Sequence, residues 1–107
     1  YVEVKGVDLI KDGLAMFPDA PTIRGTKHLL ELEKIVKAGG EAMVIFLVAR
    51  ADAKSFRPHF ERDPVFADSF YKVINSGVQA RVYLTNVGPN FIELSDRIPI
   101  KNINELK

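Results

Sequence analysis

The chain opens with Tyr1-Val2-Glu3-Val4-Lys5-Gly6-Val7-Asp8-Leu9-Ile10, a run in which apolar and charged residues alternate. Such alternation predicts a β-strand, because successive side chains of a strand point to opposite faces. Glu3 and Lys5 are then expected on one face, with Val2 and Val4 packed on the other. At ~3.4 Å per residue, the Cα atoms of Glu3 and Lys5 lie roughly 7 Å apart. The stretch therefore places a carboxylate and an ammonium group side by side.

This pair suits metal-assisted phosphate chemistry. A carboxylate holds hard divalent cations, and a lysine neutralises charge on an attacked phosphate or orients the attacking water. The acidic-x-Lys spacing also occurs in Asp52-Ala53-Lys54 and Glu105-Leu106-Lys107. Only Glu3 and Lys5 lie on a predicted strand that a core could hold rigid. The alternative is an exposed strand face that carries charge for solubility, and the triplet alone leaves it open.

Composition limits the classes of function. The chain has 107 residues and 47% hydrophobic content, enough for one domain with one modest core. Its 15 basic and 14 acidic residues give a net charge of +1, so an anionic partner must meet a local basic patch. The absence of cysteine excludes disulfides and thiolate metal sites, and fits a cytoplasmic protein. The longest apolar run, residues 42–49, is too short to span a bilayer, so we expect no membrane association.

The segment after the first strand predicts a hairpin and then a helix. Lys11-Asp12-Gly13 is a turn signal, and Leu14–Phe17 is expected to return antiparallel to the first strand. Thr22 is expected to cap a helix that runs to about Ala38, where Gly39-Gly40 closes it.

The remaining segments predict a second helix between strands. Residues 42–49 are apolar without alternation, which favours a central strand covered on both faces. Residues 51–62 indicate an irregular loop that ends at Asp63-Pro64, a helix cap followed by proline at the first helical position. Residues 78–85 alternate as a half-buried strand, and residues 91–94 are expected to return as an edge strand. This order of elements predicts an α/β fold, with a mixed sheet flanked by helices.

A polar face recurs on the first predicted helix. Arg24, Lys27 or His28, and Glu31 recur at helical spacing, so the first two turns present a compact polar cluster. The start of a helix also favours anions, because its backbone N–H groups lack partners and its dipole is positive there. An ordinary solvated face is the alternative interpretation, and the spacing does not decide between them.

Two longer strings carry a resemblance to a known family. The first is Val2-Glu3-Val4-Lys5-Gly6-Val7, and the second is Met16-Phe17-Pro18-Asp19-Ala20-Pro21-Thr22-Ile23-Arg24-Gly25-Thr26-Lys27-His28-Leu29. Residues 42–49, Ser55-Phe56-Arg57-Pro58, Asp63-Pro64 and the final hairpin extend the match over nearly the whole chain. In these strings the sequence resembles the sugar fermentation stimulation protein family.

The resemblance implies a fold and a domain organisation. Family members have an amino-terminal OB-like module and a carboxy-terminal domain similar to the PD-(D/E)xK nucleases. Residues 1–107 would then be the later part of a restriction-endonuclease-like domain. The OB-like module and the first part of the nuclease-like domain would be absent. The first residue is Tyr and lies inside a predicted strand, so we expect the chain to be a fragment.

The resemblance also implies roles for individual residues. Glu3 and Lys5 match the catalytic Glu-x-Lys pair, with Glu3 as a ligand to Mg²⁺ or Mn²⁺. The family string favours Arg24, Lys27 and His28 as contacts to DNA phosphate. If the start of the helix faces the carboxyl end of the first strand, His28 is expected to tune Glu3 instead, and a surface or packing role is the alternative. The acidic residue that normally precedes this strand is not in the sequence. Pro18-Asp19 follows the strand instead, and we interpret it as a structural turn rather than as a metal ligand.

The functional prediction is a DNA-binding protein with a metal-dependent nuclease-like site. The alternative is a non-catalytic DNA-binding regulator of sugar utilisation genes on the same scaffold. A nucleic-acid-independent interaction domain is a third interpretation, which the near-neutral charge allows. DNA is the expected partner in the first two, and homo-oligomerisation is left open.

Overall fold

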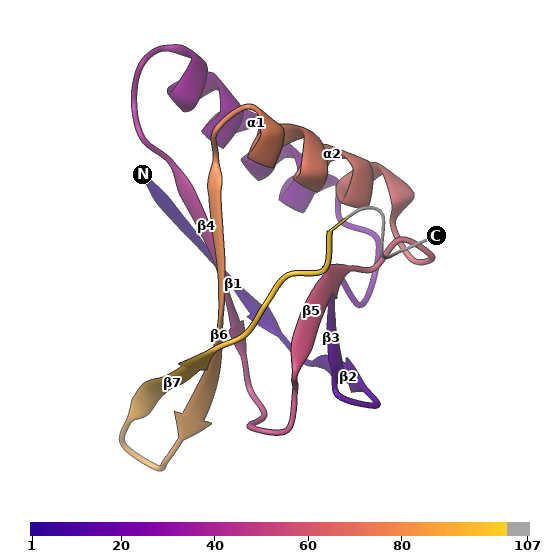
Figure 1. Cartoon of the computed structure of the whole chain (residues 1–107), viewed down its shortest axis with the longest axis vertical. Helices are drawn as coiled ribbons and strands as arrows, with labels where there is room; N and C mark the ends of the chain where they lie inside the picture. The colour runs from indigo at the N-terminus through magenta and orange to yellow at the C-terminus, as the bar shows by residue number, and fades with distance from the viewer. Residues whose placement is uncertain (103–107) are drawn as a thin grey trace.

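The computed structural model describes residues 1–102, with the side chain of Val87 excepted. The Glu105-Leu106-Lys107 triplet lies outside this range. Within residues 1–102 nine elements follow one another (Figure 1): β1 (Val2–Val7), β2 (Leu9–Lys11), β3 (Leu14–Phe17), α1 (Ile23–Lys37), β4 (Met43–Val48), β5 (Ser55–Pro58), α2 (Pro64–Asn75), β6 (Gln79–Val87) and β7 (Ile92–Arg97).

The main sheet has the strand order β1-β4-β6-β7. β1, β4 and β6 run parallel and β7 is antiparallel to β6, so the predicted mixed α/β sheet is confirmed. Parallel neighbours require crossover connections, and α1 and α2 supply the two crossovers. β4 lies between β1 and β6, as expected of the central strand. Within residues 1–102, neither helix is long and apolar enough to cross a membrane.

Both helices lie on the same face of this sheet. Lys5 of β1 and Phe46 of β4 are partners in register and therefore share a face. The His28 side chain of α1 contacts Lys5 on that face. The Phe70 ring of α2 lies 5.8 Å from the Phe46 ring, measured between centroids. The expected sheet flanked by helices is therefore covered by them on one face only.

This arrangement overturns the expected orientation of the first strand. Val2 and Val4 are 59% and 53% exposed, whereas Glu3 and Lys5 face the helices. The expectation that β4 is covered on both faces is also wrong within the described residues, because Met43, Ile45 and Leu47 are only half-buried. Alternation reports which residues share a face, but the position of the helices decides which face is covered.

A second, smaller sheet has the order β2-β3-β5. The predicted ten-residue strand is broken at Asp8, where the chain passes from the main sheet into the small one. The hairpin turn at Asp12-Gly13 is confirmed, with φ values of 53° and 80° that suit a two-residue turn. Its first strand is β2, however, and not a continuation of β1. β5 pairs in parallel with β3, so the prediction of an irregular loop over residues 51–62 is wrong for Ser55–Pro58.

An aromatic cluster joins the two sheets to the helices. The Phe46 ring of the main sheet lies 4.6 Å from the Phe56 ring of the small sheet, between centroids. Phe17 from β3 lies 5.3 Å from Phe66 of α2. Four of the rings are fully buried, namely Phe46, Phe56, Phe66 and Phe70. Rings of this size dominate the apolar area that a small core buries, so this cluster is the main connection between the layers.

The helix caps agree with the sequence prediction. The Thr22 hydroxyl accepts a hydrogen bond from the Gly25 amide at 2.9 Å, and α1 ends at Lys37 before Ala38. Asp63 caps α2 by accepting from the Phe66 amide at 3.0 Å. Its other oxygen accepts from the Thr22 amide at 2.8 Å, at the start of α1. The buried carboxylate of Asp63 therefore holds the first turns of both helices together.

Glu33 links the helices further along α1. Its carboxylate accepts a hydrogen bond from the Ser76 hydroxyl at 2.7 Å and lies 3.7 Å and 3.6 Å from Lys37 and Lys72. The Ser76 hydrogen bond, with the two lysines, holds the pKa of this carboxyl below its usual value. Glu33 therefore remains ionised at neutral pH while it sits at the junction of α1 and α2.

Gly25→Ala is expected to lower the free energy of unfolding by about 1–2 kcal/mol, despite alanine's advantage of ~1 kcal/mol in helices. A Cβ at residue 25 would lie 2.7 Å from Thr22 Cγ2 and 3.3 Å from Phe66 Cε2. Thr22 cannot rotate away without losing its cap hydrogen bond. Urea unfolding measures the change. Gly6→Ala is the control, because a Cβ there meets no atom within 4 Å. A Gly25→Ala protein as stable as the unsubstituted one would contradict this account.

Candidate active site

Three polar side chains meet between β1 and α1. Lys5 Nζ lies 2.8 Å from His28 Nδ1 and 3.3 Å from Glu3 Oε1. His28 Nδ1 lies 3.1 Å from the same Glu3 oxygen. The two-residue period of β1 turns Glu3 and Lys5 to the helix-covered face, and the second turn of α1 supplies His28. The structure thus brings together three of the five residues singled out in the sequence.

Proton positions within this cluster are interdependent. Lys5 has three N–H donors and can donate to both Glu3 and an unprotonated His28 Nδ1. If Nδ1 carries the proton, it donates to Glu3 instead. In that case Nδ1–H and the N–H donors of Lys5 point toward each other and cannot hydrogen-bond. The cluster therefore has two arrangements that differ in where one proton lies. Nδ1 can thus accept a hydrogen bond from Lys5 or donate one to Glu3, and the tautomer of His28 decides which.

The cluster is partly sheltered from solvent. The exposed fractions of the side chains are 14% for Lys5, 21% for His28 and 33% for Glu3. Partial removal of water strengthens the interactions among the three groups compared with an open surface. Glu3, the most exposed of them, keeps access from solvent.

The other two predicted contacts lie outside the cluster. Arg24 and Lys27 are exposed on α1, and Arg24 precedes His28 by one helical turn. Within residues 1–102 neither side chain forms an ion pair with Glu3. They border the same end of α1, so they could meet a ligand that also reaches the cluster. Their role in phosphate binding stays a prediction.

The residues provide one oxygen ligand for a divalent cation and not a full set. In the described part of the chain, no group of three or more His, Cys, Asp or Glu side chains is arranged to hold a metal ion. Mg²⁺ is often bound through one or two carboxylates with several waters retained. Glu3 is compatible with such a site as one ligand. Within the Glu3, Lys5 and His28 cluster, Glu3 is the one carboxylate.

The structure distinguishes Glu3-Val4-Lys5 from Asp52-Ala53-Lys54, two acidic-x-Lys triplets that have the same spacing in the sequence. Asp52 pairs with Arg50 at 2.6 Å, and both side chains are 57% exposed. Such a pair is an ordinary surface ion pair. The contact between Lys5 and His28 was missed in the sequence. The signal available was the β1-α1-β4 order, because the crossover helix between parallel strands packs over the sheet.

Comparison with known proteins adds independent information. The family profile described as Sugar fermentation stimulation protein RE domain matches residues 1–91. A Sugar fermentation stimulation protein homolog from Clostridium kluyveri is 52% identical over 101 residues, covering 94% of this chain and 44% of the relative. The homolog from Methanobrevibacter smithii is 49% identical over 94 residues, covering 88% of this chain and 39% of the relative.

A solved structure has the same fold. Pyrococcus furiosus SfsA in complex with Ca²⁺ matches with a TM-score of 0.86 at 28% sequence identity, over 94% of this chain and 44% of that one. The chain thus spans less than half the length of the relatives it matches. The family profile covers Glu3, Lys5 and His28 together. The chain therefore belongs to the sugar fermentation stimulation protein family.

Proposed function

We propose that this domain binds DNA and hydrolyses its phosphodiester bonds at Glu3, Lys5 and His28, on a restriction-endonuclease-like scaffold. The observation that carries the proposal is the short contact of Lys5 Nζ with both His28 Nδ1 and Glu3 Oε1 on the helix-covered face of β1. A carboxylate, an ammonium group and an imidazole in contact supply a metal ligand, a positive charge and a proton acceptor. These are the groups that phosphodiester hydrolysis uses.

A divalent cation is the cofactor we infer, Mg²⁺ or Mn²⁺. The support is the carboxylate of Glu3 and the Ca²⁺ complex of Pyrococcus furiosus SfsA, since Ca²⁺ prefers oxygen ligands as Mg²⁺ does. When bound, such an ion polarises a phosphoryl oxygen and lowers the pKa of a bound water. We infer that the remaining oxygen ligands come from water and from elsewhere in the full-length protein.

The chain's own residues have separate tasks in this proposal. Lys5 stabilises negative charge on the phosphate while water attacks phosphorus and the bond to the leaving sugar oxygen breaks. Its contacts with Glu3 and His28 fix the ammonium before substrate arrives. The imidazole of His28 takes the proton that the attacking water releases, and solvent supplies the proton that the leaving sugar oxygen takes up. Glu3 orients Lys5 and offers the one oxygen ligand.

Arg24 and Lys27 are proposed to hold the DNA backbone. Both are exposed near the start of α1, where the helix dipole also favours phosphate. Such contacts give affinity without sequence specificity, and each phosphate neutralised makes binding more sensitive to salt. A second candidate function is DNA binding without cleavage. It is favoured by one observation: residues 1–102 contain no complete set of metal ligands.

Plasmid nicking tests the proposal directly. The full-length protein is incubated with supercoiled plasmid and Mg²⁺ or Mn²⁺, with EDTA in a parallel reaction. Conversion to the open circle in the presence of the metal, and none with EDTA, is the expected result. Retardation of DNA without nicking would establish the non-catalytic function instead. If the protein neither binds nor nicks DNA at low salt, both DNA-dependent functions are ruled out. The third interpretation, an interaction domain independent of nucleic acid, would then be favoured.

A further inference from the structure

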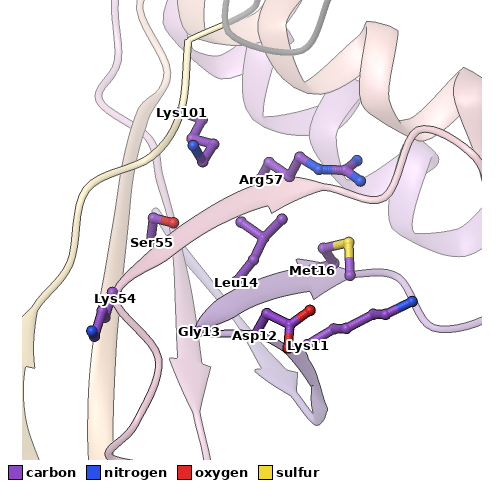
Figure 2. A pocket seen from close by; sticks show the side chains of 9 residues that line it. All are labelled: Lys11, Asp12, Gly13, Leu14, Met16, Lys54, Ser55, Arg57 and Lys101. Carbon is purple, nitrogen blue, oxygen red and sulfur yellow. The ribbon is translucent and has the colours of Figure 1, made fainter.

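The outer face of the small sheet is hollowed, away from the Glu3 cluster. A pocket of about 500 Å³ lies over β2, β3 and the start of β5 (Figure 2). Nine residues line it: Lys11, Asp12, Gly13, Leu14, Met16, Lys54, Ser55, Arg57 and Lys101. Binding sites for small molecules in proteins typically have volumes of about 300–1,000 Å³, so this pocket has the size of a ligand site.

Strand register explains why these residues share a face. Leu14 and Met16 of β3 pair with Ser55 and Arg57 of β5. Paired residues lie on one face, and the alternate residue Phe56 points into the core. The pocket therefore has an apolar floor, Leu14 and Met16, on the side of the small sheet that faces away from the aromatic cluster.

The charge of the pocket is unusual for this chain. Among the described residues, Lys11, Lys54, Arg57 and Lys101 line it with one carboxylate, Asp12, although the whole chain carries a net charge of only +1. The guanidinium of Arg57 is paired with Glu61 at 2.6 Å and 3.0 Å, and it holds the pKa of Glu61 below its usual value. Arg57 is therefore held in place by Glu61, and the exposed Lys11 and Lys54 outnumber Asp12 in the lining.

The lysines come from separate segments with fixed backbones. The Gly13 carbonyl accepts from the Lys54 amide at 2.7 Å and ties the hairpin turn to β5. The stem of Lys54 passes over Gly13, because a Cβ there would lie 3.7 Å from Lys54 Cγ. The Tyr71 hydroxyl donates to the Lys101 carbonyl at 2.6 Å, and the Lys101 amide donates to the Phe56 carbonyl at 2.8 Å. The backbones of Lys54 and Lys101 are thus both held by hydrogen bonds to other segments.

We propose that this pocket binds a phosphate-bearing ligand, with the phosphate at Lys11 or Lys54, which extend toward opposite ends of the pocket (Figure 2), and the rest of the molecule on Leu14 and Met16. Lysine is a strong donor to phosphate oxygens, and an apolar floor adds contact area for an organic group. The phosphate could belong to a small free molecule or to a DNA backbone. This inference does not depend on cleavage at Glu3 and Lys5.

Phenyl phosphate is the probe, because it combines a phosphate with an apolar group. It is titrated into the ¹⁵N-labelled full-length protein, and amide shifts at residues 11–14 and 54–57 are followed by NMR. Those amides are expected to shift, with tighter binding than inorganic phosphate shows. The double variant Lys11→Gln/Lys54→Gln should bind phenyl phosphate at least about tenfold more weakly. Both lysines are exposed, so the fold is retained. Lys37→Gln, an exposed lysine outside the pocket, is the matched control.

Competition with DNA shows which molecule supplies the phosphate, and the variants test whether the pocket binds phosphate at all. If a 12-base-pair duplex displaces phenyl phosphate, the ligand is the DNA backbone. If the duplex leaves phenyl phosphate bound, the ligand is a small free molecule. Both support a phosphate site. The proposal is overturned if these amides do not shift at millimolar phenyl phosphate, or if Lys37→Gln weakens binding as much as the double variant.

Discussion

Lys5→Ala is expected to reduce metal-dependent nicking of plasmid DNA by at least about 10²-fold, with DNA affinity nearly unchanged. The reason is geometric. The Lys5 ammonium lies 3.3 Å from Glu3 Oε1 and 2.8 Å from His28 Nδ1, and its loss would remove the charge proposed to stabilise the attacked phosphate. Binding relies instead on exposed cations such as Arg24 and Lys27, which the substitution does not touch. Nicking rate and gel retardation are measured on the same preparation.

Lys37→Ala is the control for the loss of one lysine. Lys37 lies at the far end of α1, where it is 63% exposed. Its removal should leave nicking and binding unchanged, because exposed ion pairs contribute little. Cleavage that persists in Lys5→Ala would place the chemistry elsewhere in the protein. If Lys5→Ala lost DNA binding as well as cleavage, Lys5 would contribute to binding DNA rather than to stabilising the transition state. Circular dichroism would show whether the fold had changed.

Asp63→Ala is expected to lower the free energy of unfolding by about 2–4 kcal/mol. The substitution leaves two amides without their acceptor, that of Thr22 at the start of α1 and that of Phe66 in the first turn of α2. Each buried donor left without a partner costs about 1–3 kcal/mol, and loss of a helix cap costs about 1 kcal/mol. Urea unfolding followed by circular dichroism should show a lower midpoint.

Two further variants test whether the effect comes from the double cap. Asp68→Ala, on the exposed side of α2, should change stability by less than about 0.5 kcal/mol. Asp63→Asn keeps one amide-accepting oxygen and should lose less stability than Asp63→Ala. If Asp63→Asn and Asp63→Ala were equally destabilised, only one of the two hydrogen bonds would matter.

Local signals predicted the helices well. Thr22 and Asp63 were identified as caps because hydroxyl and carboxylate side chains accept the first amides of a helix, and glycine follows each helix where positive φ is needed. The period of β1 likewise placed Glu3 beside Lys5. These features depend on neighbours in sequence, so the sequence contains them.

Features that depend on distant contacts were not predicted. β5 is four residues long and ends in proline, and it becomes a strand only by pairing with β3. The exposure of Val2 and Val4 depends on which face the helices cover. The position of His28 beside Lys5 depends on how α1 packs over β1. The family strings selected His28 nonetheless, which residue spacing alone could not do.

The orientation of β1 bears on how this domain could evolve. Valines face solvent while a glutamate and a lysine lie under a helix, the reverse of what burial of apolar area favours. Apolar residues of similar size in place of the charged pair would remove the cost of desolvating two ions. β1 is thus less stabilising than it could be at Glu3 and Lys5, the positions proposed to carry the chemistry. Variants selected only for heat resistance would be expected to lose this cluster early, and variants that keep it must gain their stability elsewhere in the core.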